Sequence, residues 1–170
     1  MPQSIKAPAA CKPHELESFK AMLLLSGQEG EAGLDERIAQ AELLAFHYEN
    51  KKLVAIAGLK PANLGYLKGI FKKAGILEQG PGYSLELGWA HVLGEYRQKG
   101  LGPVLMKKLL ERCPDRAVFS IVRLSDEEMA LGLRKQGFVA SGEPYSRRGH
   151  RYKYQAYLRE LPVKPDAAVS

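Results

Sequence analysis

The segment that carries the clearest chemistry runs Arg97-Gln98-Lys99-Gly100-Leu101-Gly102. It follows a strand-like run and leads directly into an apolar helical pattern. Glycines at the start of a helix let backbone amides approach an anion closely, and the helix dipole favours negative charge there. Arg97 and Lys99 add positive charge at the same place. The pattern predicts a site that holds a pyrophosphate without a metal.

The same short motif also has a simpler explanation, a glycine-rich turn that only starts a helix, because short glycine patterns recur by chance. Two nucleotide-binding classes are excluded by their own requirements. A Rossmann unit needs a third glycine and an acid on a second strand. The phosphate-binding loop of NTPases needs Gly-Lys followed by Ser or Thr. Neither pattern is in place here.

Glu86 is the candidate for acid–base chemistry, on the strand-like run that precedes the glycine motif. Strict alternation along this run assigns its residues to two faces. One face would carry Ser84, Glu86, Gly88 and Ala90, and the other Tyr83, Leu85, Leu87, Trp89 and His91. The face of Glu86 has little bulk, so a substrate would have room beside the carboxylate. The alternative is a solvated strand carboxylate without a catalytic role.

Together these motifs resemble the GNAT superfamily of acyl-CoA-dependent N-acyltransferases. Arg97-x-x-Gly100-x-Gly102 matches the family's (Gln/Arg)-x-x-Gly-x-(Gly/Ala) signature. The segment 86–89 (ELGW) looks like the family's acidic strand, and the segments 123–129 and 135–138 are similar to its strand–helix unit that closes in Gly-Phe. The resemblance covers residues 83–138 well and the earlier elements more loosely.

The resemblance implies that acetyl-CoA is the acyl donor and a primary amine the acceptor. An amine with a pKa of about 10 is only about a thousandth neutral at neutral pH, so the reaction needs a base, and Glu86 would fill this role. Backbone amides near Ala90 and Val92 would polarise the thioester carbonyl. The other expected cofactor-binding residues are Arg97, Gln98, Lys99, Gly100, Leu101, Gly102 and Asp126.

Two positions depart from the family's pattern. Leu133 stands where many members have a tyrosine that protonates the departing thiolate, and Asp126 stands where the family has an asparagine. A thiolate with a parent pKa of about 8.5 leaves without a dedicated acid, or Tyr83, Tyr145 or Tyr152 supplies the proton. Asp126 is equally well explained as an N-cap of the helix that follows it.

Hydrophobic spacing predicts the elements that position these groups. Helices are expected at 13–25, from residue 35, and at 64–74, 100–113 and 126–136. Strands are expected at 43–48, 53–59, 83–93, 117–122, 138–141 and 152–158, with the first two forming a hairpin. The order implies an α+β fold with a parallel crossover between residues 83 and 122. The resemblance implies a mixed, mostly antiparallel sheet, flanked by helices, in which the parallel strand pair is splayed.

Length and composition set the remaining expectations. Of the 170 residues, 1–161 are expected to form one domain and 162–170 a disordered tail. The net charge of +6 suits a polyanionic partner, which could be a nucleotide cofactor, nucleic acid or an acidic lipid surface. Two cysteines are too few for a disulfide framework or zinc site. We expect a cytoplasmic protein with reduced thiols, no metal and no membrane partner.

Two other function classes stay open. Leu133 and Asp126 would suit a CoA-binding regulatory module that has lost catalysis. The basic and aromatic segment 147–154 would suit a nucleic-acid-binding protein, although a hairpin loop with a solvated charged face explains it more simply. The sequence does not decide between a small-molecule and a protein acceptor, or between a monomer and a homodimer.

Overall fold

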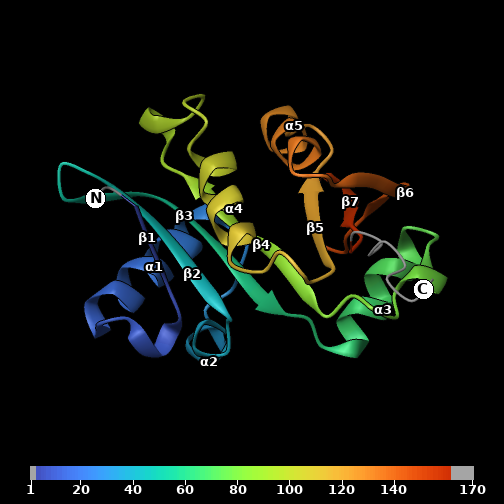
Figure 1. The fold of residues 1–170 in the computed structure, drawn as a ribbon, viewed down its shortest axis with the longest axis horizontal. Helices are drawn as coiled ribbons and strands as arrows, with labels where there is room; N and C mark the ends of the chain where they lie inside the picture. The colour runs from blue at the N-terminus through green and yellow to red at the C-terminus, as the bar shows by residue number, and fades with distance from the viewer. Residues whose placement is uncertain (1–2, 162–170) are drawn as a thin grey trace, which may run out of the picture.

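A seven-stranded sheet in the order β1-β2-β3-β4-β5-β7-β6 organises the part of the chain that the computed structural model describes, residues 3–161 (Figure 1). The strands are β1 (Gln3–Lys6), β2 (Leu43–Glu49), β3 (Lys52–Pro61), β4 (Leu85–Val92), β5 (Val118–Arg123), β6 (Val139–Ser146) and β7 (Lys153–Arg159). Neighbouring strands are antiparallel except β4 and β5, which are parallel. The predicted mixed sheet with one parallel pair is confirmed.

Helices cover both faces of the sheet. They are α1 (Pro13–Ser26), α2 (Leu34–Ala39), α3 (Leu64–Lys73), α4 (Leu101–Glu111) and α5 (Glu127–Lys135). α4 and α5 pack one face, where Leu105 and Leu133 join a core with Leu87. On the other face, α1 and α2 cover β2 to β4 and α3 covers β5 and β7. The apolar stripes that predicted these helices are the surfaces they bury.

Each predicted helix and strand is present close to its expected bounds, and the structure adds β1. β1 pairs antiparallel with β2, and the Lys6 Nζ lies 2.9 Å from the Glu15 carboxylate on α1. Its four residues are mostly polar and carry no alternating pattern, so only docking on β2 makes them a strand. The predicted tail, residues 162–170, lies outside the described residues, and the domain boundary at 161 stays a prediction.

The parallel pair β4–β5 separates soon after it starts. The two strands pair at Leu85 with Val118, Glu86 with Phe119 and Leu87 with Ser120, and no pairing follows. Figure 1 shows them diverging toward the helix starts of α4 and α5. The predicted splay is therefore present, and among the described residues the backbone of Gly88–Val92 has no strand partner on its β5 side.

A β-bulge at Trp89 accompanies the separation. Trp89 has a φ of 57°, and the β3–β4 register shifts between Ile56 and Gly58. The extra residue places Glu86 and Trp89 on the same face, where both contact Lys60, while Ala90 packs with the α4 core on the other face. The predicted strict alternation was therefore wrong beyond Gly88, because a bulge inserts one residue into the pleat.

Candidate active site

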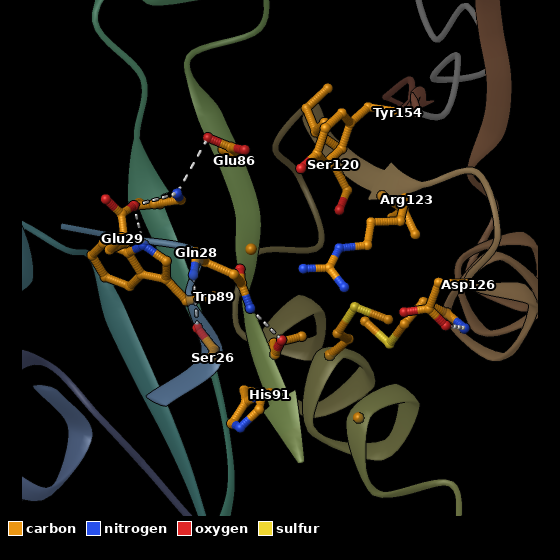
Figure 2. A pocket seen from close by; sticks show the side chains of 18 of the residues that line it. Ser26, Gln28, Glu29, Glu86, Trp89, His91, Ser120, Arg123, Asp126 and Tyr154 are labelled. Atoms are coloured by element: carbon orange, nitrogen blue, oxygen red, sulfur yellow. Dashed lines mark hydrogen bonds and ion pairs between the residues drawn. The ribbon is translucent and has the colours of Figure 1, made fainter. Parts of the chain in front are cut away.

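The divergence of β4 and β5 opens a cleft of about 1480 Å³ that is lined from both faces of the sheet. On the α4 side its lining includes the starts of α4 and α5. On the other side it includes Glu86, the α1–α2 connection, the start of α3 and the β6–β7 connection. Figure 2 shows side chains from β4 and β5 facing each other across this space. The cleft therefore joins two surfaces that the sheet would otherwise separate.

The start of α4 is built to receive an anion. Gly100 is its N-cap residue with a φ of 73°, and a glycine has no side chain of its own to cap the helix. Gln98 also has a positive φ, 63°. A Cβ on Gly102 would lie 3.1 Å from the Met129 sulfur, so glycine allows close packing against α5. The amide of Gly100 already donates to an anion, the Glu128 carboxylate, at 3.1 Å. The residues present therefore fit a phosphate-bearing ligand.

Most of the predicted cofactor-binding residues share this cleft. Those that line it are Ala90, Val92, Arg97, Gln98, Leu101, Gly102 and Asp126. Lys99 and Gly100 do not line it: the Lys99 Nζ lies 5.2 Å above the Tyr96 ring, and Gly100 shapes the turn. Asp126 also caps α5, because its Oδ1 accepts a hydrogen bond from the Met129 amide at 3.2 Å. The helix-cap interpretation of Asp126 is therefore confirmed.

Arg123 is a cleft residue that the sequence analysis did not single out. It ends β5, its guanidinium lies 4.0 Å from the centre of the Tyr152 ring, and Figure 2 shows it pointing into the cleft. Burial, together with the charges of Arg97 and Arg123, lowers the pKa of His91 below its usual range. His91 is therefore neutral at pH 7. The positive charge near it comes from Arg97 and Arg123. A lone arginine at a strand end gives no sequence signal.

Glu86 is a buried carboxylate with only 5% of its surface exposed. The Tyr66 hydroxyl on α3 donates to its Oε2 at 3.1 Å, and the Lys60 Nζ on β3 lies 3.6 Å from its Oε1. Burial, and next the Glu86 charge, raises the pKa of Tyr66 far above its usual range. The phenol therefore stays protonated and remains a donor. The alternative of a solvated strand carboxylate was wrong, and part of the space expected beside Glu86 holds these partners.

The connection between α1 and α2 is fastened to the bulge. The Trp89 indole N–H donates to Glu29 at 2.9 Å, and Glu29 also pairs with Arg37 at 3.0 Å. The Gln28 side chain donates to the Ala90 carbonyl at 2.8 Å. These contacts fix the indole and one backbone group of the bulge (Figure 2). A loop of polar residues gave no sequence signal for this role.

The segment 147–154 contributes to the cleft as well as to the surface. The β6–β7 hairpin is confirmed, but Arg147 and Tyr154 line the cleft. The Arg147 Nη2 donates to the Tyr66 hydroxyl at 3.4 Å, and its guanidinium lies 5.1 Å from the centre of the Tyr154 ring. The Tyr154 hydroxyl lies 2.7 Å from the His150 Nδ1. The expected solvated charged face was therefore wrong for Arg147, which is half-buried, and for Tyr154, which is buried.

None of the three tyrosines considered as proton donors lines the cleft. Tyr83 and Tyr145 are buried in the core beneath α3, and the Tyr152 hydroxyl accepts a hydrogen bond from Arg151. Leu133 is fully buried. The tyrosines that do line the cleft are Tyr66, Tyr96 and Tyr154, and Figure 2 shows Tyr154 on the opposite side of the cleft from Glu86.

Residues 3–161 contain no group of three or more His, Cys, Asp or Glu side chains placed to hold a metal ion. Within the same range, no helix combines the length and hydropathy of a membrane span. Cys11 and Cys113 are both free thiols.

Comparison with known structures identifies the fold. The Escherichia coli protein ElaA superposes with a TM-score of 0.67 at 17% identity, over 93% of this chain and 98% of that one. An acyl-CoA N-acyltransferase from Pseudomonas aeruginosa gives 0.66 at 15% identity, over 93% and 98%. A GNAT family acetyltransferase from Elizabethkingia anophelis with acetyl-CoA bound gives 0.58 at 15% identity, over 94% and 99%. At these identities the likeness shows a shared fold.

Curated proteins give no significant sequence match to this chain. The family model of the acetyltransferase (GNAT) family, in contrast, matches residues 14–138, from α1 to the residue before β6. This match spans well over half of the chain and includes the bulged strand, the glycine turn and both helices that flank the cleft. The chain belongs to the GNAT acetyltransferase family.

Proposed function

We propose that this protein is an N-acetyltransferase that transfers the acetyl group of acetyl-CoA to a primary amine, with Glu86 as the general base. The observation that carries this proposal is the one cleft that holds both the buried Glu86 carboxylate and the glycine turn at the start of α4. A cytoplasmic location, suggested by the free thiols, belongs to the same proposal.

The donor would enter on the α4 side. Amides at the start of α4 and the side chains of Arg97 and Arg123 would hold the pyrophosphate, because these groups line the same wall. The backbone near Ala90 and Val92 would polarise the thioester carbonyl. In support, this stretch of β4 has no strand partner on its β5 side.

The acceptor would enter on the side of α1 and α3. Its amine would attack the carbonyl carbon, so that a C–N bond forms, the C–S bond breaks and the thiolate leaves. The proton lost by the amine would pass to Glu86, directly or through a water. Tyr66 and Lys60 would keep the carboxylate oriented toward the bulge.

Replacement of Glu86 tests the assignment. Glu86→Gln keeps the shape of the side chain and removes the basic oxygen, so turnover should fall by about 10²-fold or more. The affinity for acetyl-CoA should stay unchanged, because Glu86 lies on the other face from the α4 turn. Thiol release and calorimetry measure the two quantities.

Glu78→Gln is the matched control, since it makes the same charge change on an exposed residue outside the cleft. Equal turnover in Glu86→Gln and the unmodified protein would reject the base assignment. Binding of acetyl-CoA without turnover of any amine would favour the alternative of a CoA-binding module, which the buried Leu133 also suits.

A further inference from the structure

Arg147 is a half-buried cation beside the proposed base. Within residues 3–161, no carboxylate oxygen lies within 4.0 Å of its guanidinium. Two other cations on this side of the cleft are matched, because Lys60 pairs with Glu86 and Arg37 with Glu29. Lys73 and Arg148 also line the cleft without an ion-pair partner within residues 3–161, but both are exposed, whereas Arg147 is half-buried. Arg147 is therefore the unpaired cation that water screens least.

The guanidinium is also held in place. Its Nη2 donates to the Tyr66 hydroxyl at 3.4 Å, and its Cζ lies 5.1 Å from the centre of the Tyr154 ring. Tyr154 is itself fixed by the 2.7 Å contact with His150. A fixed guanidinium that uses one N–H leaves other donors of its fork for a carboxylate, which it can bind through two parallel hydrogen bonds.

The position of Arg147 relative to Glu86 limits what can bind. One oxygen atom, the Tyr66 hydroxyl, contacts both the Glu86 carboxylate at 3.1 Å and the Arg147 guanidinium at 3.4 Å. An amine beside Glu86 therefore lies close to any anion bound by Arg147. In a free amino acid a single carbon separates the amine from the carboxylate, which matches this spacing.

We propose that the acceptor is a free amino acid, with its carboxylate on Arg147 and its amine next to Glu86. This inference rests on the proposed function and names its substrate class. A peptide N-terminus has an uncharged amide in place of that carboxylate, and a lysine side chain has no anion near its amine. Either acceptor would leave the charge of Arg147 unmatched.

Matched acceptor pairs test this inference. Thiol release is measured at saturating acetyl-CoA with each of the standard amino acids and with its carboxamide. At least one free amino acid should have a kcat/KM about 10-fold or more above that of its amide. The amine of the amide is less basic and more of it is neutral, so chemistry alone would favour the amide. A preference for the acid therefore reports binding of the carboxylate.

Variants of Arg147 connect the preference to this residue. Arg147→Met should lower kcat/KM for the preferred amino acid by about 10-fold to 10²-fold and change the value for its amide little. Arg147→Lys should recover part of the loss, because it restores the charge without the fork. Arg151→Met is the matched control: it removes the same charge from the same hairpin, at a side chain outside the cleft.

Three results would overturn the inference while the proposed function stands. The first is an equal kcat/KM for the free amino acids and their amides. The second is an equal fall in kcat/KM for the acid and the amide in Arg147→Met. The third is turnover of amines other than amino acids and their amides only. If the unmodified protein does not bind acetyl-CoA, the proposed function fails and the inference fails with it.

Discussion

Glu128 acts at two helix ends, one near it in sequence and one distant. As one of two acids in the first turn of α5 it reads as a favourable partner of the helix dipole. In the fold its carboxylate accepts a hydrogen bond from the Gly100 amide, at the start of α4. This carboxylate stabilises the same helix end that would hold the pyrophosphate. A pyrophosphate bound there, as proposed, would compete with Glu128 for this amide.

Removing the charge of Glu128 should strengthen donor binding. Glu128→Gln is expected to raise the affinity for acetyl-CoA by about 2- to 5-fold, since a charge at a helix end contributes about 0.3–1 kcal/mol. Calorimetry measures the change. Glu127→Gln is the control, because it removes the same charge from the same turn without a contact to Gly100. If the two variants gain affinity equally, the contact with Gly100 has no specific effect.

At the scale of elements, the bulged strand β4 decides the geometry of the site. The bulge turns Trp89 toward α1, where it packs on Phe19 with ring centroids 5.8 Å apart. It also turns Ala90 toward α4. The indole can lie this close to β3 only because residue 58 is a glycine, since a Cβ added there would meet the ring at 2.9 Å. Gly58 therefore permits the position that the Trp89 ring takes at the bulge.

Filling the space above Gly58 should damage both stability and binding. Gly58→Ala is expected to lower the free energy of unfolding by about 1–3 kcal/mol, because the Trp89 ring must move. Weaker binding of acetyl-CoA should follow from the altered bulge. Urea denaturation and calorimetry measure the two effects.

Gly69→Ala provides the comparison for Gly58→Ala. Gly69 lies on the exposed side of α3, and an added Cβ there meets nothing within 4 Å. This change should stabilise the protein by about 0.5–1 kcal/mol, as Ala does in place of Gly within helices. A Gly58→Ala protein as stable as the unmodified one would show that the ring position does not depend on residue 58.

At the scale of the whole molecule, the sheet separates two chemical environments that the cleft connects. The face of α4 and α5 presents the glycine turn with Arg97 and Arg123, and the face of α1 to α3 presents Glu86 and Arg147. In the proposed reaction the donor and the acceptor would therefore approach from opposite faces of the sheet. The net charge of +6 favours an anionic donor at long range.

Salt should weaken donor binding through the phosphates. Between about 50 and 500 mM salt the Kd for acetyl-CoA is expected to rise by about 3- to 10-fold, because added ions screen the attraction between the phosphates and the basic cleft. S-acetylpantetheine, which carries the thioester but lacks the phosphates, should bind weakly with a Kd that salt hardly changes. The same salt response for both compounds would argue against a phosphate site at α4.

The sequence by itself determined the elements and the glycine turn. Apolar spacing placed the helices and most strands, and the turn at residues 97–102 is local in the chain, so it could be predicted without knowing any neighbour. It also pointed to Glu86, which the structure places in the same cleft as that turn, while the catalytic role stays a prediction. Local patterns suffice where hydrogen bonding and burial depend on nearby residues.

The tertiary structure decided what surrounds these groups. The bulge at Trp89, the edge strand β1 and the positions of Glu128 and Arg147 depend on partners distant in sequence. The contact between Gln28 and Ala90 is another such case. A single polar residue in a loop carries no periodic signal. Its residue type therefore fits a solvent-exposed position as well as a position in a binding site. Only the packing of the chain brings it to its partner.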